Sequence, residues 1–275
     1  MQSSTKKQLE RFLAEDIKSG DITSKLLERK KITGTIISRE DGIVAGVSYA
    51  KEIFSSRGCK VTIHKKDGQA VTPNQKIMTI LGDTYPVLSC ERTALNLMSR
   101  MSGIATQTNQ YAKKIRAVNP KVGLYSTRKT APGLRIFDKD AVAMGGGHKH
   151  RMSLDQMVMI KDNHIAASDS LFELIQRAKC KHEKIEVEVE SLENAITASI
   201  EGAQIIMLDN MSPPKIKKII QELKRLGLRD RVKIEASGGI NHSNITQYAK
   251  SGVDMISIGK LTSVVTGLDL SLEIS

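Results

Sequence analysis

The sequence has few aromatic residues and no tryptophan. Phenylalanine and tyrosine make up only 3% of its 275 residues, so it offers few platforms on which nucleic-acid bases could stack. It also contains no zinc-finger or RNA-binding sequence motif. A net charge of +12 would otherwise suggest nucleic acid as a partner, but without these features we expect none.

Long hydrophobic runs and paired cysteines are also lacking. No stretch approaches the roughly 18 apolar residues of a membrane-spanning helix, and the first residues have no apolar core of a secretory signal. The cysteines, Cys59, Cys90 and Cys180, are odd in number and have no metal-binding spacing, which favours reduced thiols. We therefore expect a cytoplasmic protein that does not associate with membranes.

The first part of the chain has the pattern of an α+β domain, which we place at residues 1–108. Apolar residues recur at helical spacing over 6–17 and over the long segment 91–117. Short strand-like runs separated by turn residues lie between them, at 32–38, 42–47, 61–65 and 76–81.

From residue 121 onward, strand-like runs alternate with helical patterns. The strand-like runs are 122–125, 157–160, 185–189, 205–208, 232–234 and 255–258, and the helical patterns are 169–179, 192–200, 214–226 and 245–251. Such alternation predicts parallel strands joined by crossover helices. Without a GxGxxG turn, the strands favour an incomplete α/β barrel over residues 109–268, although a doubly wound sheet has the same pattern.

Positively charged residues gather between Ser126 and Ile165, around a glycine triplet at 145–147. They are Arg128, Lys129, Arg135, Lys139, Lys149, Arg151 and Lys161. Several directly follow a strand-like run, and the carboxyl ends of parallel barrel strands converge on one pocket. The pattern therefore predicts a pocket for a small anionic molecule, since arginine and lysine are the usual partners of carboxylate and phosphate groups.

Carboxylates follow the remaining strand-like runs. Glu186, Glu188 and Glu190 alternate along one run, which places them on the same face of a strand, and Asp209 ends the next run. Mg²⁺ is bound by one or two carboxylates together with substrate phosphates. Glu188 and Asp209 are the candidate ligands, directly or through water.

Glycines at the last two strand ends complete the predicted pocket. Ser237–Gly239 follows Glu235, and Gly259–Lys260 follows the final run. Many barrels bind a phosphate at this place through backbone N–H groups. Together with the cations and carboxylates, the loops favour a phosphorylated sugar as a substrate.

These blocks resemble the quinolinate phosphoribosyltransferase family over nearly the whole chain. The matching motifs are Gly20–Thr23, Cys90–Asn96, Ser102–Thr106, Thr127–Thr130, Pro132–Arg135, Gly145–Gly147, His150–Arg151, Ile160–His164, Glu186–Val189, Leu208–Asn210, Ser237–Gly239 and Ser257–Gly259. The resemblance implies an open-faced N-terminal α/β sandwich followed by an incomplete α/β barrel. It also implies that residues 269–275 return to the N-terminal domain.

The resemblance implies an enzyme, a pentosyltransferase of the carboxylating nicotinate-nucleotide diphosphorylase type. It would transfer the phosphoribosyl group of 5-phosphoribosyl 1-diphosphate to quinolinate with decarboxylation. The products would be nicotinate mononucleotide, pyrophosphate and carbon dioxide, a step of NAD biosynthesis that needs Mg²⁺. A homodimer, alone or within a hexamer, is implied, in which Arg92 completes the neighbour's site.

The family positions also assign site residues. The expected catalytic residues are Lys129, Lys161, Glu188 and Asp209. The expected substrate-binding residues are Arg92, Thr127, Arg128, Lys129, His150, Arg151, Lys161, Glu188, Asp209, Ser237, Gly238, Gly239, Gly259 and Lys260. Of these, the resemblance gives the serine and glycines to the 5′-phosphate.

The residues alone leave alternatives open. Arg92 could be a surface arginine on its helix, Lys161 could form a Schiff base, and His148 with His150 could be a metal pair. A paralogue encoded with molybdenum transporters shares the fold but typically lacks the motif that is intact here at 161–164. A phosphoribosyltransferase for nicotinate would need a different arginine pattern.

Overall fold

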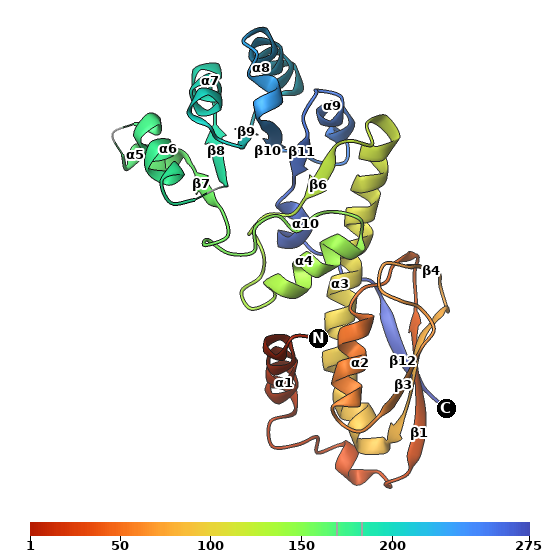
Figure 1. Cartoon of the computed structure of the whole chain (residues 1–275). Coiled ribbons are helices and arrows are strands. Elements are labelled where there is room, and N and C mark those ends of the chain that lie inside the picture. Colours follow the sequence, from red (N-terminus) through yellow and green to blue (C-terminus); the bar gives the residue numbers. More distant parts are fainter. Residues whose placement is uncertain (169, 183) are drawn as a thin grey trace. The chain divides into compact units, whose positions relative to one another are not determined.

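The computed structural model describes residues 1–168, 170–182 and 184–275 (Figure 1). By their internal contacts these residues form two units. Unit 1 comprises Met1–Asn109, Asp140–Gly146 and Val264–Ser275, and unit 2 comprises Gln110–Lys139 and Gly147–Ser263. Among the described helices, none combines the length and the apolar composition needed to cross a membrane.

Unit 1 is built on an antiparallel sheet with the strand order β12-β1-β5-β3. Its strands are β1 (Lys31–Ser38), β3 (Lys60–Ile63), β5 (Lys76–Asp83) and β12 (Leu270–Ile274), and β2 (Gly42–Ile43) pairs separately with β4 (Ala70–Val71). Helices α1 (Ser3–Ile17), α2 (Val47–Ser55) and the first part of α3 (Thr84–Val118) belong to the same unit. Helix α2 packs on β3 and β5, and α1 packs on α2, which gives the expected α+β sandwich.

The strand expected over 42–47 is shorter in the structure. Only Gly42 and Ile43 pair with another strand, because Gly46 has a φ of 88° and α2 begins at the next residue. A residue in the left-handed conformation interrupts an extended run, and glycine adopts this conformation at no steric cost.

The C-terminal segment returns to unit 1. Strand β12 pairs with β1, with Ser38 opposite Leu270 and Gly34 opposite Ile274. Before it pairs, the segment crosses α3 closely, and the Leu268 N–H donates to the Ser99 carbonyl at 3.0 Å. The crossing requires Gly103 on α3, because a Cβ there would overlap the Thr266 carbonyl.

Unit 2 contains six parallel strands in the order β6-β11-β10-β9-β8-β7. They are β6 (Gly123–Tyr125), β7 (Val158–Ile160), β8 (Ile185–Val189), β9 (Ile205–Asp209), β10 (Lys233–Ser237) and β11 (Met255–Ser257). The helices are α4 (Arg135–Met144), shared with unit 1, α5 (Asp162–Ala166), α6 (Leu171–Lys179), α7 (Leu192–Glu201), α8 (Pro213–Arg225), α9 (Ile245–Ala249) and α10 (Lys260–Ser263). The expected helix over 169–179 begins at Leu171, and Asp169 lies outside the described residues.

The strand order is that of a barrel with one gap. Strands β7 to β11 are neighbours in chain order, and β6 lies beside β11, whereas a doubly wound sheet would reverse its order at a switch point. Within the described residues no pairing joins β6 to β7, which are the two edges of the sheet. The chain between these edges, residues 126–157, includes α4, and His148 within it forms an isolated parallel bridge with Tyr125 of β6.

Alternate strand residues separate the core from the site. Val187, Ile206 and Ile234 are fully buried, and the side chains next to them in sequence point to the other face of the sheet. Amphipathic helices cover the apolar face, as in α8, whose buried residues are Ile216, Ile219, Ile220 and Leu223. The other face is left for polar groups.

We predict that Gly103→Ala destabilises the protein. A gain of up to about 1 kcal/mol in helix propensity is outweighed by overlap with the Thr266 carbonyl, since overpacking costs about 1–3 kcal/mol and a backbone atom cannot rotate away. Thermal unfolding measures the effect, with Asn96→Ala, an exposed site on the same helix, as the control. A Gly103→Ala protein as stable as wild type would show that this crossing is not tight.

Candidate active site

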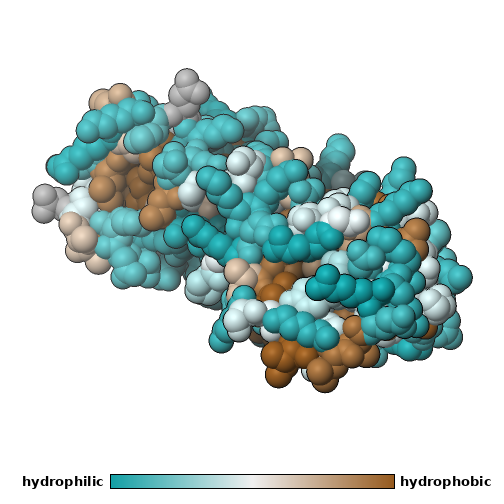
Figure 2. Space-filling model, turned by 90° about the horizontal axis from the view of Figure 1, so that it is seen from below, coloured by the Kyte–Doolittle hydropathy of each residue, from teal (hydrophilic) through white to brown (hydrophobic). Residues whose placement is uncertain are grey.

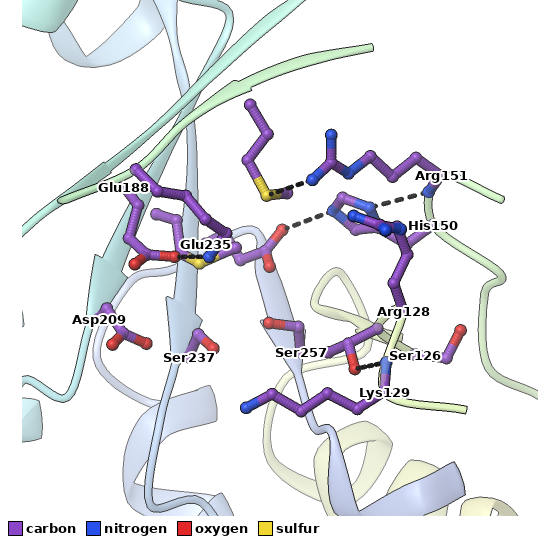
Figure 3. Close-up of a pocket in the computed structure, with 14 residues that line it drawn as sticks. Ser126, Arg128, Lys129, His150, Arg151, Glu188, Asp209, Glu235, Ser237 and Ser257 are labelled. Atoms are coloured by element: carbon purple, nitrogen blue, oxygen red, sulfur yellow. Dashed lines mark hydrogen bonds and ion pairs between the residues drawn. The ribbon is translucent and has the colours of Figure 1, made fainter. Parts of the chain in front are cut away.

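A pocket of about 410 Å³ lies in unit 2, at the carboxyl ends of its parallel strands (Figure 3). It is lined by Ser126, Thr127, Arg128, Lys129, His150, Arg151, Met159, Lys161, Glu188, Met207, Asp209, Glu235, Ser237 and Ser257. Most of the residues expected from the sequence are brought together here. The expected residues that do not line it are Arg92, Gly238, Gly239, Gly259 and Lys260.

The strand register places the acidic side of the pocket. Asp209 of β9 is directly opposite Ser237 of β10. Two residues further down these strands, Met207 lies between Glu188 of β8 and Glu235 of β10. Because inward side chains alternate along a strand, the pocket has a carboxylate and a hydroxyl at its rim and two glutamates around a methionine below.

The cationic side comes from the residues that follow β6 and β7. The Lys129 N–H donates to Thr127 Oγ1 at 3.1 Å, which turns the chain so that Arg128 and Lys129 both line the pocket. The buried Arg128 Nε has no hydrogen-bond partner within the described part of the chain. Arg128 therefore presents an unused donor at the pocket wall. Lys161, by contrast, forms an ion pair with Glu188.

Arg151 is fixed by the strand that it precedes. Its guanidinium donates from Nη1 to the Met157 carbonyl at 3.2 Å and lies 3.2 Å from the Met159 sulfur through Nη2. Arg135, which is outside the pocket lining, donates to the Met152 carbonyl at 3.1 Å and to Thr130 Oγ1 at 3.2 Å. Arg135 thus supports the segment that carries Arg151 and does not itself contact the pocket.

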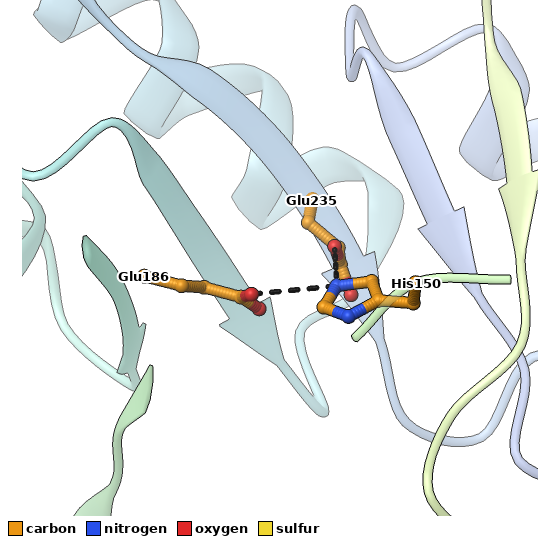
Figure 4. Close-up of side chains that lie close together, drawn as sticks. All are labelled: His150, Glu186 and Glu235. Atoms are coloured by element: carbon orange, nitrogen blue, oxygen red, sulfur yellow. Dashed lines mark hydrogen bonds and ion pairs between the residues drawn. The ribbon is translucent and has the colours of Figure 1, made fainter. Parts of the chain in front are cut away.

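His150 lies between two buried glutamates (Figure 4). Its Nε2 is 3.3 Å from a carboxylate oxygen of Glu186 and 3.3 Å from one of Glu235, and both glutamate side chains are 0% exposed. Burial opposes a charge on the ring, but the two carboxylates outweigh it and raise the pKa of His150 to about 9. Burial also raises the pKa of Glu186. Both shifts favour the protonated forms of these two groups.

The arrangement of His150, Glu186 and Glu235 does not suit a metal ion, although their ligand atoms lie within 4.8 Å of one another. With its pKa raised to about 9, His150 keeps a proton on Nε2, so the lone pair that a metal would need is absent there. His148 stacks on Tyr125, with ring centroids 4.7 Å apart.

The loop after β10 turns through two glycines in the left-handed region. Gly238 and Gly239 have φ angles of 85° and 64°, and a Cβ on Gly238 would overlap the Asn210 side chain. At the next strand end, a Cβ on Gly259 would lie 2.9 Å from Lys129 Cδ, so this glycine leaves room for Lys129. Lys260 is exposed and begins α10.

Several lining residues were not expected from the sequence. Ser126, Met159, Met207, Glu235 and Ser257 all line the pocket. Glu235 and Ser237 share the two-residue period of β10, so the sequence held a signal for Glu235. Ser257 Oγ is buried without a hydrogen-bond partner in the described residues, and its place in the matching motif Ser257–Gly259 was the sequence signal for it.

Comparisons with known proteins cover almost the whole chain. The family description "Quinolinate phosphoribosyl transferase, C-terminal domain" matches residues 104–273, and the corresponding N-terminal domain matches residues 21–102. A probable nicotinate-nucleotide pyrophosphorylase [carboxylating] of Methanothermobacter thermautotrophicus is 44% identical, covering 94% of this chain and 95% of the relative. The nicotinate-nucleotide pyrophosphorylase [carboxylating] of Mycobacterium leprae is 37% identical, covering 97% and 95%.

A solved structure agrees with the observed fold. The crystal structure of nicotinate-nucleotide pyrophosphorylase from Ehrlichia chaffeensis has a TM-score of 0.92 and 34% sequence identity, covering 100% of this chain and 99% of the other. The N-terminal sandwich and the incomplete barrel expected from the sequence are therefore confirmed.

We predict that Glu235→Gln lowers the pH at which His150 loses its proton. Removing one of two flanking negative charges weakens the hold on that proton. A ring proton with a raised pKa stabilises the fold at low pH, and this contribution is lost as the pH rises through about 9 in the wild type. An NMR titration of labelled histidine checks this, with Glu190→Gln, at an exposed glutamate directly after β8, as the control. An unchanged midpoint in Glu235→Gln would contradict it.

Proposed function

The chain belongs to the quinolinate phosphoribosyltransferase family, and we propose that the pocket of unit 2 is where it carries out that family's reaction. The enzyme transfers the phosphoribosyl group of 5-phosphoribosyl 1-diphosphate to quinolinate and releases pyrophosphate and carbon dioxide. The product, nicotinate mononucleotide, enters NAD biosynthesis. The observation that carries the assignment to this pocket is its division into a cationic side and an acidic side with a glycine loop.

The cationic side suits quinolinate, which has two carboxylates on adjacent ring carbons. Arg128 and Arg151 can each bind a carboxylate through parallel N–H bonds. The unpartnered Nε of Arg128 supports this role, because a buried donor without a partner costs free energy until a ligand accepts from it. Lys129 and His150 lie beside these arginines in the pocket lining.

The acidic side suits the ribose. Displacement of pyrophosphate from the anomeric carbon develops positive charge on the sugar, and nearby carboxylates stabilise such charge. Glu188 and Asp209 line the pocket on neighbouring strands. Ser237, Gly238 and Gly239 would hold the 5′-phosphate through backbone N–H groups, with Gly259 and Lys260 at the next strand end. Thr127 holds the turn that presents Arg128.

Glu188 and Asp209 also fit a magnesium ion. Both carboxylates line the pocket, and each has oxygen lone pairs left after its contact with Lys161 or Asn210. These two carboxylates would hold the Mg²⁺, which would supply positive charge to offset that of the leaving diphosphate. The residues themselves orient the ribose and hold the sugar opposite the acid.

Decarboxylation follows from the chemistry of the transferred ring. Once the ring nitrogen carries the ribose it is cationic and draws electrons from the adjacent carbon, so the carboxylate there can leave as carbon dioxide. Lys129 and Lys161 are the ammonium groups on this side of the pocket, and their charge would stabilise the carbanion-like centre. The ion pair of Lys161 with Glu188 suits an ammonium and argues against the Schiff-base alternative.

We expect the purified protein with Mg²⁺ to convert quinolinate and 5-phosphoribosyl 1-diphosphate but not nicotinate. A single carboxylate cannot satisfy both arginines, and an unpaired buried charge is strongly unfavourable. Release of labelled carbon dioxide and formation of nicotinate mononucleotide measure the reaction, and a chelator should abolish it. Equal turnover of nicotinate, or no carbon dioxide from quinolinate, would sink the assignment.

We also propose that the enzyme is a homodimer, alone or in a hexamer, in which Arg92 acts in the neighbour's pocket. Arg92 is exposed on α3 in unit 1 and does not line the pocket of unit 2. Unit 1 also exposes apolar side chains, among them Ile22, Leu26 and Leu27. Figure 2 shows apolar groups at the surface among hydrophilic ones, as expected of a surface that is covered in an assembly.

The three free thiols support a reducing compartment such as the cytoplasm.

Subunit complementation tests the shared site. Arg92→Ala and Lys161→Ala should each be inactive alone, because each destroys every site of its own homodimer. In a mixed dimer one pocket has an intact Lys161 and an intact partner Arg92, so random mixing should restore about a quarter of the wild-type activity. Mixing Lys161→Ala with Asp209→Ala, two changes in the same pocket, is the control without recovery. No recovery with Arg92→Ala would place Arg92 in its own chain's site or outside any site.

A further inference from the structure

Lys139 is the one fully buried lysine among the described residues, and the chemistry above does not use it. It lies on α4, its exposed fraction is 0%, and it is outside the pocket lining. Its ammonium donates to the carbonyl of Lys149 and, at 2.6 Å, to the carbonyl of Arg151. These carbonyls belong to the two residues that flank His150 in the sequence.

The segment that Lys139 holds has an unfavourable backbone. His150 has a φ of 52°, in the left-handed region that few residues other than glycine adopt. Such a conformation persists only when surrounding contacts enforce it. Here the contacts include the two bonds from Lys139, a bond from Ser126 Oγ to the Lys149 carbonyl at 2.8 Å, and the backbone bridge of His148 to Tyr125.

The strained backbone has a consequence for the pocket. It turns His150 toward Glu186 and Glu235, while the next residue, Arg151, reaches the Met157 carbonyl. Successive side chains of an extended segment would point to opposite sides. With this turn, both His150 and Arg151 line the same pocket.

The charge on Lys139 is also unusual for its surroundings. Burial, followed by the positive charges of Arg135, Arg128, Arg151 and Lys149, lowers its pKa to about 8. Those residues come from its own helix, from the turn after β6 and from the segment before β7. A buried ammonium among cations is unfavourable in itself, so the two carbonyls are the contacts that favour its charged form.

We propose that Lys139 is a positioning residue for recognition of the acid substrate, which holds the Lys149–Arg151 segment so that His150 and Arg151 meet the carboxylates of a pyridine dicarboxylate. The inference deepens the proposed function and rests on it. Lys139 touches neither substrate in this account. The phosphoribosyl side of the pocket is built from strand ends that Lys139 does not contact, so the effect should be confined to the acid.

The test compares the Michaelis constants of the two substrates in Lys139→Met. This variant has a side chain of similar length without a donor or a charge. The KM for quinolinate should rise about tenfold or more, since small displacements of binding groups have effects of this size, while the KM for 5-phosphoribosyl 1-diphosphate should stay within about twofold of wild type. Lys149→Met removes a neighbouring charge but keeps the carbonyl that Lys139 binds, and should leave both constants unchanged.

A second variant covers the case in which Lys139→Met does not fold. Lys139→Arg keeps donors for the carbonyls with a charge that is not lost below about pH 12. In the wild type, loss of the Lys139 proton should raise the KM for quinolinate above pH 8, and in Lys139→Arg this rise should move to higher pH, toward the titration of the His150 cluster. A purely structural lysine would not produce this shift.

The outcomes separate the two proposals. Wild-type protein that does not turn over quinolinate would overturn the proposed function. Wild-type turnover with an unchanged quinolinate KM in Lys139→Met, or an equal rise in both constants, would overturn the role of Lys139 alone. So would a folded Lys139→Arg protein whose pH profile matches that of the wild type.

Discussion

Positive charges that bind one small dianion repel each other before it arrives, and the site of unit 2 depends on how that repulsion is contained. The pocket of about 410 Å³ gathers Arg128, Lys129, His150, Arg151 and Lys161. Carboxylates already placed among them offset the repulsion, with Glu188 paired to Lys161 and two buried glutamates around His150. Folding supplies the free energy that brings these charges together. On the proposed assignment, quinolinate meets cationic side chains that are already in place, and little of its binding free energy is lost to their rearrangement.

The two sides of the pocket are held by different kinds of structure. Glu188, Asp209 and Ser237 are on strands whose parallel register fixes them relative to one another. The arginines and His150 belong to the chain between β6 and β7, where the barrel is open. That chain is joined to β6 by the backbone bonds of His148, and the side chains of Arg135 and Lys139 hold further carbonyls of it.

Much of this could be predicted from the sequence, for physical reasons that differ by region. Buried apolar runs with helices between them identified all six strands of unit 2, and family motifs identified most of the pocket lining. The sequence pattern does not predict helix α4, because the cations on this helix interrupt its apolar periodicity. It predicts a strand over 42–47, because nothing in the sequence shows that Gly46 has a left-handed φ. The pairing of Glu186 with His150 could not be predicted, since it depends on the register of β8 and β10 and on the backbone of a loop.

The gap between β6 and β7 divides the pocket residues into two groups. Those on the segment 126–157 can be substituted, whereas those on the strands are fixed by the register of the sheet. A substitution on β9 or β10 disturbs the register of its neighbours, and with it the ribose and phosphate side. The residues within 126–157 that line the pocket lie outside the ladders that join β7 to β11, so a substitution at one of them leaves that register in place. On the proposed assignment, the strand ends bind the sugar phosphate, and the segment 126–157 recognises the acid. Libraries confined to that segment would be the economical way to direct ribosyl transfer to other aromatic acids.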